Sequence, residues 1–297
     1  YVRSVRKRKA RAVQILEPVV DEGLSAEETR LVDAALMANP SNQNEQLSDC
    51  VTRKEARTVR AEKWFSDGIV GAFGRHLEQC ARERALSVQS ERMRAKLRLH
   101  VMTPFFYDKL MQVQRPAYTC EDPGDGKRRK LAPDSVTQYT IGCYKYDEVQ
   151  RWHRPLIMKG RHDVDSLFDM AVLLVPVNVK GNHWCVARID VARRRIEWRD
   201  SLGGNGRDEL RVLEQWLVDQ ALEENLPSRP WETVVVLCPQ QGNGFDCGPF
   251  SCLAMESLSQ LSAVDSSLLS PVLNYSQADI PAARRRILCR ALQVVGD

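Results

Sequence analysis

The sequence lacks any run of 18 apolar residues, so we expect no transmembrane helix and no membrane partner. It has nine cysteines, but no CxxC pair and no Cys/His spacing typical of a zinc site. We therefore expect neither a disulfide framework nor a structural metal site, and the cysteines favour a reducing compartment, the cytosol or the nucleus. Internal repeats and long low-complexity tracts are also missing from the chain.

Positive charge is concentrated at the start of the chain. Residues 1–12, YVRSVRKRKARA, hold six of the 43 Lys and Arg residues and no acid, which leaves 37 basic against 39 acidic residues in the rest. That remainder lacks the basicity of a nucleic-acid-binding domain, so we expect no nucleic-acid partner. The basic segment is typical of a nuclear localisation signal or an anchor to acidic surfaces, and equally of a solvated, disordered end. No apolar stretch follows it, so we expect no secretory signal. The chain begins with Tyr1 and not with methionine, so we expect a fragment or a processed chain.

Helical and extended patterns alternate along the rest of the chain. Ser25 with Glu28, and Thr52 with Glu55, have capping-box spacing and predict two helix starts. The further predicted elements are a helical face over 64–86 that begins at Trp64, a buried strand over 170–179, a hairpin of strands 183–190 and 193–200, a helix over 208–226, a buried strand over 233–239, and a helix over 249–261. Residues 115–135, with three prolines, a PGDG turn and a KRRK run, predict an exposed loop or insertion. This order predicts a mixed α+β domain over 22–297, preceded by a flexible basic tail over 1–21.

Cys247 differs from the other cysteines in its position. It lies in QQGNGFDCGPF, residues 240–250, immediately before an apolar helical pattern, and Pro249 suits the first turn of a helix. A helix N-terminus lowers the pKa of a thiol, and the thiolate is the nucleophilic form. Gly244 and Gly248 permit a close backbone approach. The cysteines that we expect to be small buried hydrophobes are Cys185, Cys238 and Cys252.

A hairpin supplies a histidine and an acid for this thiol. Cysteine chemistry near neutral pH usually needs a histidine that is held by an acid, and of the five histidines His183 lies at the mouth of a strand. If antiparallel partners in the predicted hairpin sum to 383, Arg188 faces Arg195 and His183 faces Asp200. Directly opposed residues lie about 4.5–5.5 Å apart at Cβ, so the imidazole and the carboxylate would meet. A register slip of one residue would undo this pairing.

Gln241 lies six residues before Cys247. A side-chain amide together with a backbone N–H stabilises the oxyanion that forms when a thiolate attacks a carbonyl. A glutamine in a loop is usually solvent-facing. Because a cysteine, a histidine and an aspartate are predicted to converge here, we interpret Gln241 as an oxyanion donor.

These motifs resemble those of the Ulp/SENP family of ubiquitin-like-protein-specific cysteine proteases. The similarity includes HW at 183–184, DSL at 200–202 and PQQGNGFDCG at 239–248. It extends to LSAEETRLVDAAL, VTRKEARTV, WFSDGIV and FFYDKL, and it spans roughly residues 22–290. Order, spacing and flanking residues agree, so the combined signal is highly specific.

The resemblance implies a papain-like α+β fold with a mixed or antiparallel central sheet flanked by helices. It implies catalytic roles for His183, Asp200, Gln241 and Cys247, with no metal or other cofactor. In this family two tryptophans enclose the Gly-Gly tail of the modifier and an acid contacts the modifier; the matching residues are Trp64, Trp184 and Asp67. Taken alone, both tryptophans would be interpreted as core residues. This chain departs from the family's WLND motif at Phe65 and Ser66, and again at Pro249 and in the 115–135 insertion.

The expected function is cleavage after the C-terminal Gly-Gly of a ubiquitin-like modifier, most simply SUMO, by a monomeric nuclear or cytoplasmic enzyme. The same order of catalytic residues, histidine then acid then cysteine, also occurs in proteases for other ubiquitin-like tails and in some bacterial effector acetyltransferases. The two tryptophans favour the protease over the acetyltransferase. An inactive modifier-binding module would need a lost catalytic residue, and a nuclear scaffold would leave the catalytic pattern unexplained.

Overall fold

A five-stranded mixed sheet organises the computed structural model of the chain, which describes residues 15–16, 23–37, 42–111, 144–152, 164–227, 229–260 and 270–294. The strands are β4 (Leu99–Val101), β5 (Val172–Val179), β6 (His183–Asp190), β7 (Arg195–Arg199) and β8 (Glu232–Val235), in that spatial order. The inner pairs β5/β6 and β6/β7 are antiparallel, whereas the outer pairs β4/β5 and β7/β8 are parallel. The predicted α+β class with a mixed central sheet is confirmed.

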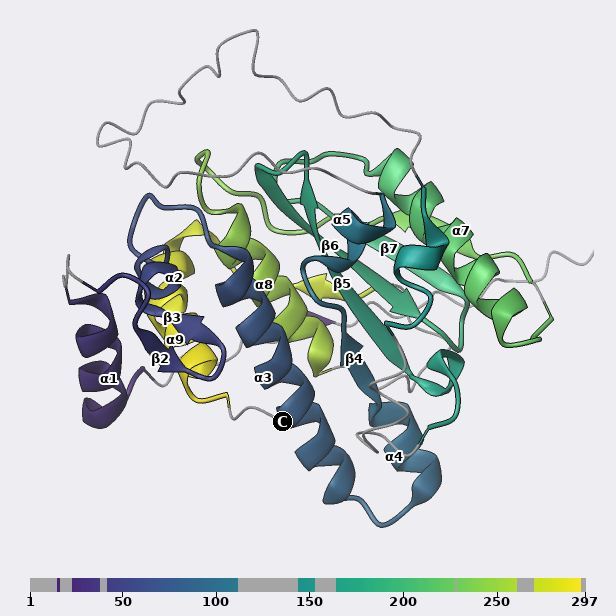
Figure 1. The fold of residues 1–297 in the computed structure, drawn as a ribbon, viewed down its shortest axis with the longest axis horizontal. Coiled ribbons are helices and arrows are strands. Elements are labelled where there is room, and N and C mark those ends of the chain that lie inside the picture. Colours follow the sequence, from purple (N-terminus) through teal and green to yellow (C-terminus); the bar gives the residue numbers. More distant parts are fainter. Residues whose placement is uncertain are drawn as a thin grey trace, which may run out of the picture.

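Helices cover both faces of this sheet (Figure 1). One face packs against α3 (Asp67–Leu86), α8 (Cys247–Ser259) and α9 (Ile280–Leu292), and the other against α5 (Phe106–Leu110) and α7 (Arg207–Glu223). The sequence of β5 is almost entirely apolar because both of its faces are buried: Val172 and Leu174 enter the first core, and Leu173 and Val175 enter the second. A strand buried on both faces has no need of polar alternation.

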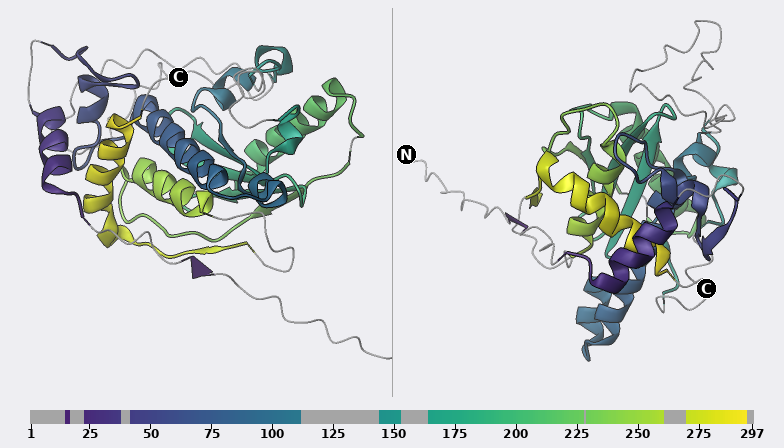
Figure 2. Two further views of the ribbon diagram at one scale, coloured as in Figure 1. Left: turned by 90° about the horizontal axis from the view of Figure 1, so that it is seen from below. Right: turned by 90° about the vertical axis from the view of Figure 1, so that its left-hand side faces the viewer.

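The remaining elements lie on both sides of the sheet. On the α3–α9 side are α1 (Ala26–Leu36), which lies beside α9 in both views of Figure 2, β2 (Gln46–Ser48), β3 (Val51–Thr52), α2 (Arg53–Arg57), α4 (Glu91–Leu97), β9 (Val272–Leu273) and the 3-10 turn Gln277–Asp279. The 3-10 turns Tyr146–Glu148 and Leu167–Asp169 pack on the α5–α7 side. The predicted capping boxes at Ser25/Glu28 and Thr52/Glu55 are both formed. Within the part of the chain that is described, no helix is both long and apolar enough to cross a membrane.

The hairpin register differs from the sequence prediction by two residues. Arg188 faces Glu197 and Asp190 faces Arg195, so paired residue numbers sum to 385 and not to 383. The turn is longer than predicted: it occupies 191–194, where Arg194 has a φ of 50° and the Asp190 carboxylate accepts the Arg193 backbone N–H at 3.1 Å. A shift of two residues preserves the face on which each side chain lies, because strand side chains alternate with period two.

Two further predictions need correction. Residues 233–239 were predicted to be a buried strand, but β8 ends at Val235 and forms an edge of the sheet, with Val235 51% and Leu237 94% exposed. Within the described residues, β8 has one neighbouring strand, and neither its residues nor Leu237 belong to either core, so these side chains stay accessible. Trp64 was predicted to lie on a helical face, but α3 begins only at Asp67, after the N-cap Ser66, so Trp64 precedes the helix.

Two predicted segments fall largely outside the described residues. The 115–135 insertion lies wholly outside them. Of the predicted tail over 1–21, only Ile15 and Leu16 are described, and they form β1, which pairs in parallel with β9. These two residues therefore belong to a strand pair and not to a free tail.

Gly206 provides a test of the packing between β7 and α7. It is the N-cap of α7, with a φ of 51°, and a Cβ atom added to it would lie 2.3 Å from the buried Trp198 ring. We expect Gly206→Ala to lower the free energy of unfolding by about 2–4 kcal/mol, because backbone strain and overpacking both contribute. Urea unfolding at unchanged m-value measures this loss.

Gly203→Ala is the matched control. Gly203 also has a positive φ, 77°, but an added Cβ would meet only the Gln240 side chain at 3.4 Å. Its loss should be about 1 kcal/mol, from backbone strain alone. Equal losses in the two variants would show that the Trp198 contact is not what requires a glycine at 206.

Candidate active site

Cys247 is the first residue of α8, as predicted, and Asp246 is the N-cap. All thirteen residues of this helix are buried, and Cys247 itself is 2% exposed. Gly248 allows the close approach of a neighbour, since an added Cβ would lie 2.6 Å from the Cβ of Phe65. Gly244 is not required for this reason, because nothing lies within 4 Å of its added Cβ.

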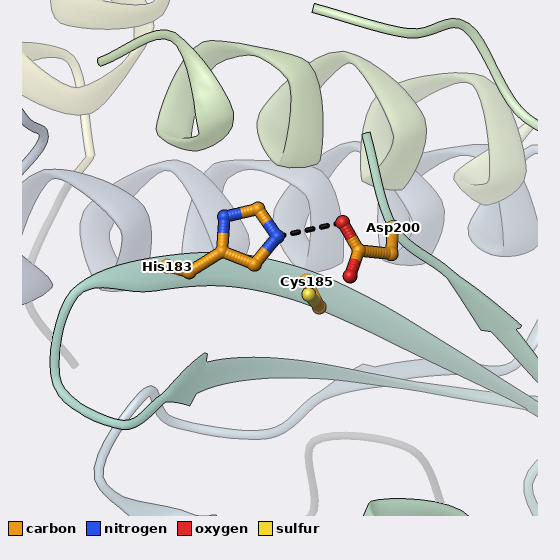
Figure 3. Close-up of side chains that lie close together, drawn as sticks. All are labelled: His183, Cys185 and Asp200. Carbon is orange, nitrogen blue, oxygen red and sulfur yellow. Dashed lines mark hydrogen bonds and ion pairs between the residues drawn. The ribbon is translucent and has the colours of Figure 1, made fainter. Parts of the chain in front are cut away.

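His183 and Asp200 meet at the end of the β6–β7 hairpin. The imidazole Nε2–H donates to Asp200 Oδ1 at 2.6 Å, and both side chains are mostly buried (Figure 3). The backbone N–H of Leu202 donates to the same carboxylate oxygen at 2.7 Å. The predicted pair is therefore formed, although Asp200 follows the last residue of β7 and does not lie directly opposite His183.

Cys185 is an unexpected third member of this group. Continuing the observed register beyond Val186 and Arg199 places Cys185 across from Asp200, with His183 at the diagonal position. The donor atoms of the three side chains lie within 4.8 Å of one another (Figure 3). Cys185 is buried, as predicted, but the prediction did not include its contact with Asp200.

The charges of the pair follow from its surroundings. Burial acts to lower the pKa of His183, but its hydrogen bonds to Asp200 and Cys247 outweigh burial and raise that pKa to about 9. Burial acts to raise the pKa of Asp200, but the hydrogen bonds from His183 and the Leu202 backbone lower it below its usual range. Burial and the adjacent Asp200 hold the pKa of Cys185 well above that of a free thiol. At neutral pH the site therefore favours a protonated imidazole and an ionised carboxylate, whereas the Cys185 thiol stays neutral.

Three donor atoms of this kind could also hold a metal ion. Here, however, His183 and Asp200 satisfy one another through a direct hydrogen bond. Cys185 keeps its proton, whereas a thiol must lose its proton to bind a metal. The chemistry of the group therefore fits an oriented acid–base pair better than a metal centre.

Gln241 is fixed in the turn that leads to Cys247. Its side-chain carbonyl accepts from the Ser201 hydroxyl at 2.6 Å, and its amide N–H donates to the Asn243 carbonyl at 2.6 Å. Its backbone N–H also donates to the Ser201 carbonyl at 2.9 Å. These bonds tie the turn to the residue after Asp200, so Ser201 is a supporting residue that the sequence prediction missed.

The two tryptophans occupy different environments. Trp64 is 43% exposed and its indole N–H donates to the Gly244 carbonyl at 3.0 Å, whereas Trp184 is 3% exposed and donates to the Phe65 carbonyl at 3.1 Å. Trp184 is therefore anchored to the segment that leads into α3. Trp64, which lies on that segment, is anchored to the turn before Cys247. Asp67, the first residue of α3, is half-buried and lies three residues after Trp64.

The arrangement of sheet and helices is that of papain-like cysteine proteases. The chain is similar to the solved C-terminal Ulp1 protease domain in complex with Smt3, the yeast orthologue of SUMO, with a TM-score of 0.63, 20% identity, and coverage of 92% of this chain and 97% of that one. It is also similar to the Ulp1-like SUMO protease catalytic domain of Chaetomium thermophilum, with a TM-score of 0.55, 22% identity, and coverage of 94% and 91%.

Residues 76–288 match the Ulp1 protease family, C-terminal catalytic domain, and the chain belongs to this family. It is 31% identical over 150 residues to Sentrin-specific protease 5 of Mus musculus, and the match covers 46% of this chain and 18% of that protein. It is 23% identical over 248 residues to Sentrin-specific protease 2 of Homo sapiens, covering 82% of this chain and 32% of that protein. The chain thus spans about a fifth to a third of the length of these relatives.

The raised pKa of His183 gives a pH-dependent prediction. We expect Asp200→Asn to lower the pKa of His183 from about 9 to its ordinary value of about 6.5 or below, because burial then opposes the charge with less compensation. In the unmodified protein, the charged imidazole contributes stability that is fully present below pH of about 6.5. This stability is lost as the pH rises through about 9. NMR titration of the His183 ring Cε1–H measures the shift.

Asp208→Asn is the control for a lost negative charge, since the Asp208 side chain is 54% accessible and pairs with Arg211, whereas the groups that raise the pKa of His183 are Asp200 and Cys247. Its His183 titration should match that of the unmodified protein. A His183 pKa that stays near 9 in Asp200→Asn would mean that the carboxylate does not hold the proton on the imidazole.

Proposed function

We propose that this chain is a cysteine protease that cleaves after the C-terminal Gly-Gly of a ubiquitin-like modifier, with SUMO as the preferred class. The modifier would be released from precursors, from lysine side chains of conjugated proteins, or from both. The observation that carries the proposal is the hydrogen-bonded His183–Asp200 pair beside Cys247 at the start of a buried helix. Membership of the Ulp1 protease family and the names of the sentrin-specific relatives support the choice of modifier.

In the proposed reaction, the Cys247 thiolate attacks the carbonyl of the last glycine and forms a tetrahedral intermediate. The protonated His183 stabilises the thiolate, and its proton passes to the leaving amine as the C–N bond breaks. A water then attacks the resulting thioester, with His183 as the base, and releases the modifier carboxylate and the free thiol. Asp200 orients the imidazole and stabilises its charge throughout, in the manner of other catalytic triads.

Gln241 and the Cys247 backbone N–H would bind the oxyanion of the intermediate. Support comes from the two side-chain bonds that fix the Gln241 amide, because a donor that is already oriented costs no reorganisation during the reaction. The Cys247 N–H lies at the start of α8, where backbone N–H groups lack helical partners.

Trp64, Trp184 and Asp67 are proposed to bind the modifier. Trp64 is exposed and bonded to the turn before the nucleophile, which suits a wall over the Gly-Gly tail. Trp184, which follows His183 in β6, is anchored to the Phe65 carbonyl on the segment that carries Trp64, and this position suits the other wall. Only residues without a Cβ would pass between two indole faces, and this would select glycine.

The test is a panel of ubiquitin-like proteins whose C-terminus carries a vinyl sulfone. A SUMO probe should label the chain on Cys247, whereas matched ubiquitin and other ubiquitin-like probes should label it far more slowly. Intact-mass and peptide analysis locate the modified residue. Labelling of Cys185, Cys238 or Cys252 would overturn the nucleophile assignment, and equal labelling by ubiquitin would overturn the modifier assignment.

Two variants sharpen this experiment. Cys247→Ser should lose both labelling and hydrolysis while it still binds the modifier. Gln241→Ala should still be labelled, because the probe alkylates without an acyl oxyanion, yet its kcat for a SUMO substrate should fall by roughly 10²–10³-fold. Unchanged hydrolysis by Gln241→Ala would remove Gln241 from the oxyanion site.

We propose in addition that the protein acts in the nucleus, with residues 1–12 as the targeting segment. The six basic residues of this segment support the proposal. Replacing all six with glutamine should reduce nuclear retention of a fluorescent fusion while the purified enzyme keeps its activity on a small SUMO substrate. Unchanged nuclear retention would exclude the segment as the signal.

A further inference from the structure

Arg284 is a buried arginine that joins two segments of the active site. It lies on α9, 38 residues after Asp246, and is 4% exposed. Its guanidinium donates to Asp246 Oδ1 through Nη2 at 2.6 Å and through Nε at 3.1 Å, and to the Phe245 carbonyl at 3.3 Å. These contacts are all to the turn that immediately precedes Cys247.

The same guanidinium binds the segment that carries Trp64. It donates to the backbone carbonyls of Val59 at 3.2 Å, Arg60 at 2.8 Å and Lys63 at 2.9 Å. It also lies over the Phe65 ring, 5.0 Å from the centroid. One side chain thus contacts both the 59–65 segment and the nucleophile turn.

These contacts need the geometry of arginine. The guanidinium has five donors in a rigid plane, whereas a lysine ammonium is a compact charge with three. Asp246 Oδ2 is already taken by the side-chain amides of Asn243 and Gln277, both at 2.6 Å, so the carboxylate is held in place from both sides. Arg284 can therefore fix the carbonyls of 59–63 relative to a stationary Asp246.

We propose that Arg284 is a positioning residue for tail recognition, which sets the separation between Trp64 and the Cys247 turn and thereby the selectivity for Gly-Gly. This inference rests on the proposed function. Two direct contacts between the Trp64 segment and the Cys247 turn support it: the Trp64 indole N–H donates to the Gly244 carbonyl, and Phe65 packs on Gly248. A larger separation between Trp64 and this turn would still admit the tail but would no longer exclude a Cβ.

A purely structural ion pair is the competing explanation, and Arg286 offers the matched control. Arg286 lies on the same helix, is 8% exposed and pairs with Glu256 on α8, nine residues beyond Cys247. Arg284→Lys and Arg286→Lys both keep a positive charge beside a buried carboxylate. Only Arg284→Lys removes the donors to the 59–63 carbonyls.

The experiment measures kcat/KM for two SUMO substrates, one ending Gly-Gly and one ending Gly-Ala, in each variant. The fraction of folded enzyme cancels from the ratio of the two values, so a loss of stability alone cannot change it. In Arg284→Lys we expect the ratio of Gly-Gly to Gly-Ala cleavage to fall about tenfold, because displacements of about 1 Å have effects of this size or larger. In Arg286→Lys it should stay within about twofold of the unmodified enzyme.

An unchanged ratio in Arg284→Lys would overturn the proposal. If Arg284→Lys does not fold, Phe65→Leu takes its place, since it removes the ring beneath the guanidinium but keeps an apolar contact to Gly248. The ratio should fall in this variant as well, and an unchanged ratio there would have the same meaning.

A second measurement needs no substrate. In protein labelled with 5-fluorotryptophan, the ¹⁹F resonance of Trp64, assigned through Trp64→Phe, should shift or broaden in Arg284→Lys and not in Arg286→Lys. If the unmodified enzyme cuts neither substrate, the proposed function fails while this resonance still reports the position of Trp64. If it cuts Gly-Gly selectively but neither the ratio nor the resonance responds to Arg284→Lys, only the positioning role is lost.

Discussion

The antiparallel pairing of β6 with β7 is the constraint on which the site depends. The register of this pairing determines where Asp200, the residue after β7, lies relative to His183, and so whether its carboxylate reaches the imidazole. The pairing is held between two cores, because Trp184 and Val186 pack on one face while Cys185 and Ala187 pack on the other. A one-residue slip would exchange these faces and separate the pair. The geometry of an acid–base pair is thus maintained by apolar packing on both sides of a sheet.

Much of this could be predicted from local sequence signals, and the errors have clear physical causes. Capping boxes, the apolar run of β5 and the position of Cys247 before a helix are local patterns, and the structure contains all of them. The hairpin register was wrong by two residues, because turn length is not determined by the alternation of strand residues. The pair still formed because an even shift keeps His183 and Asp200 on one face. The exposure of β8 could not be predicted, since its valines are typical of buried strands and edge position is a property of the whole sheet.

The residues that support the site were harder to find than those that form it. Cys185 lies across from Asp200 only in the observed register, and Ser201 becomes relevant only once the Gln241 turn folds against it. Arg284 has no local signal, since it lies on a late helix and its partners are mostly backbone carbonyls far away in the chain. A bond to a backbone carbonyl places no demand on the identity of the residue that accepts it, so the accepting end of such a contact leaves no signal in the sequence.

The complete burial of α8 has a consequence for how the protein can move. Cys247 begins a helix whose thirteen residues all lie inside the protein, so the backbone that carries the thiol cannot shift without disturbing the core. Trp64, by contrast, is partly exposed and precedes α3 on an irregular segment. Any opening and closing around the tail of the proposed substrate would therefore take place at Trp64 and not at the start of α8. Because Arg284 also binds the backbone carbonyls of Val59, Arg60 and Lys63, such a movement would be one of the exposed Trp64 side chain and not of the segment that carries it.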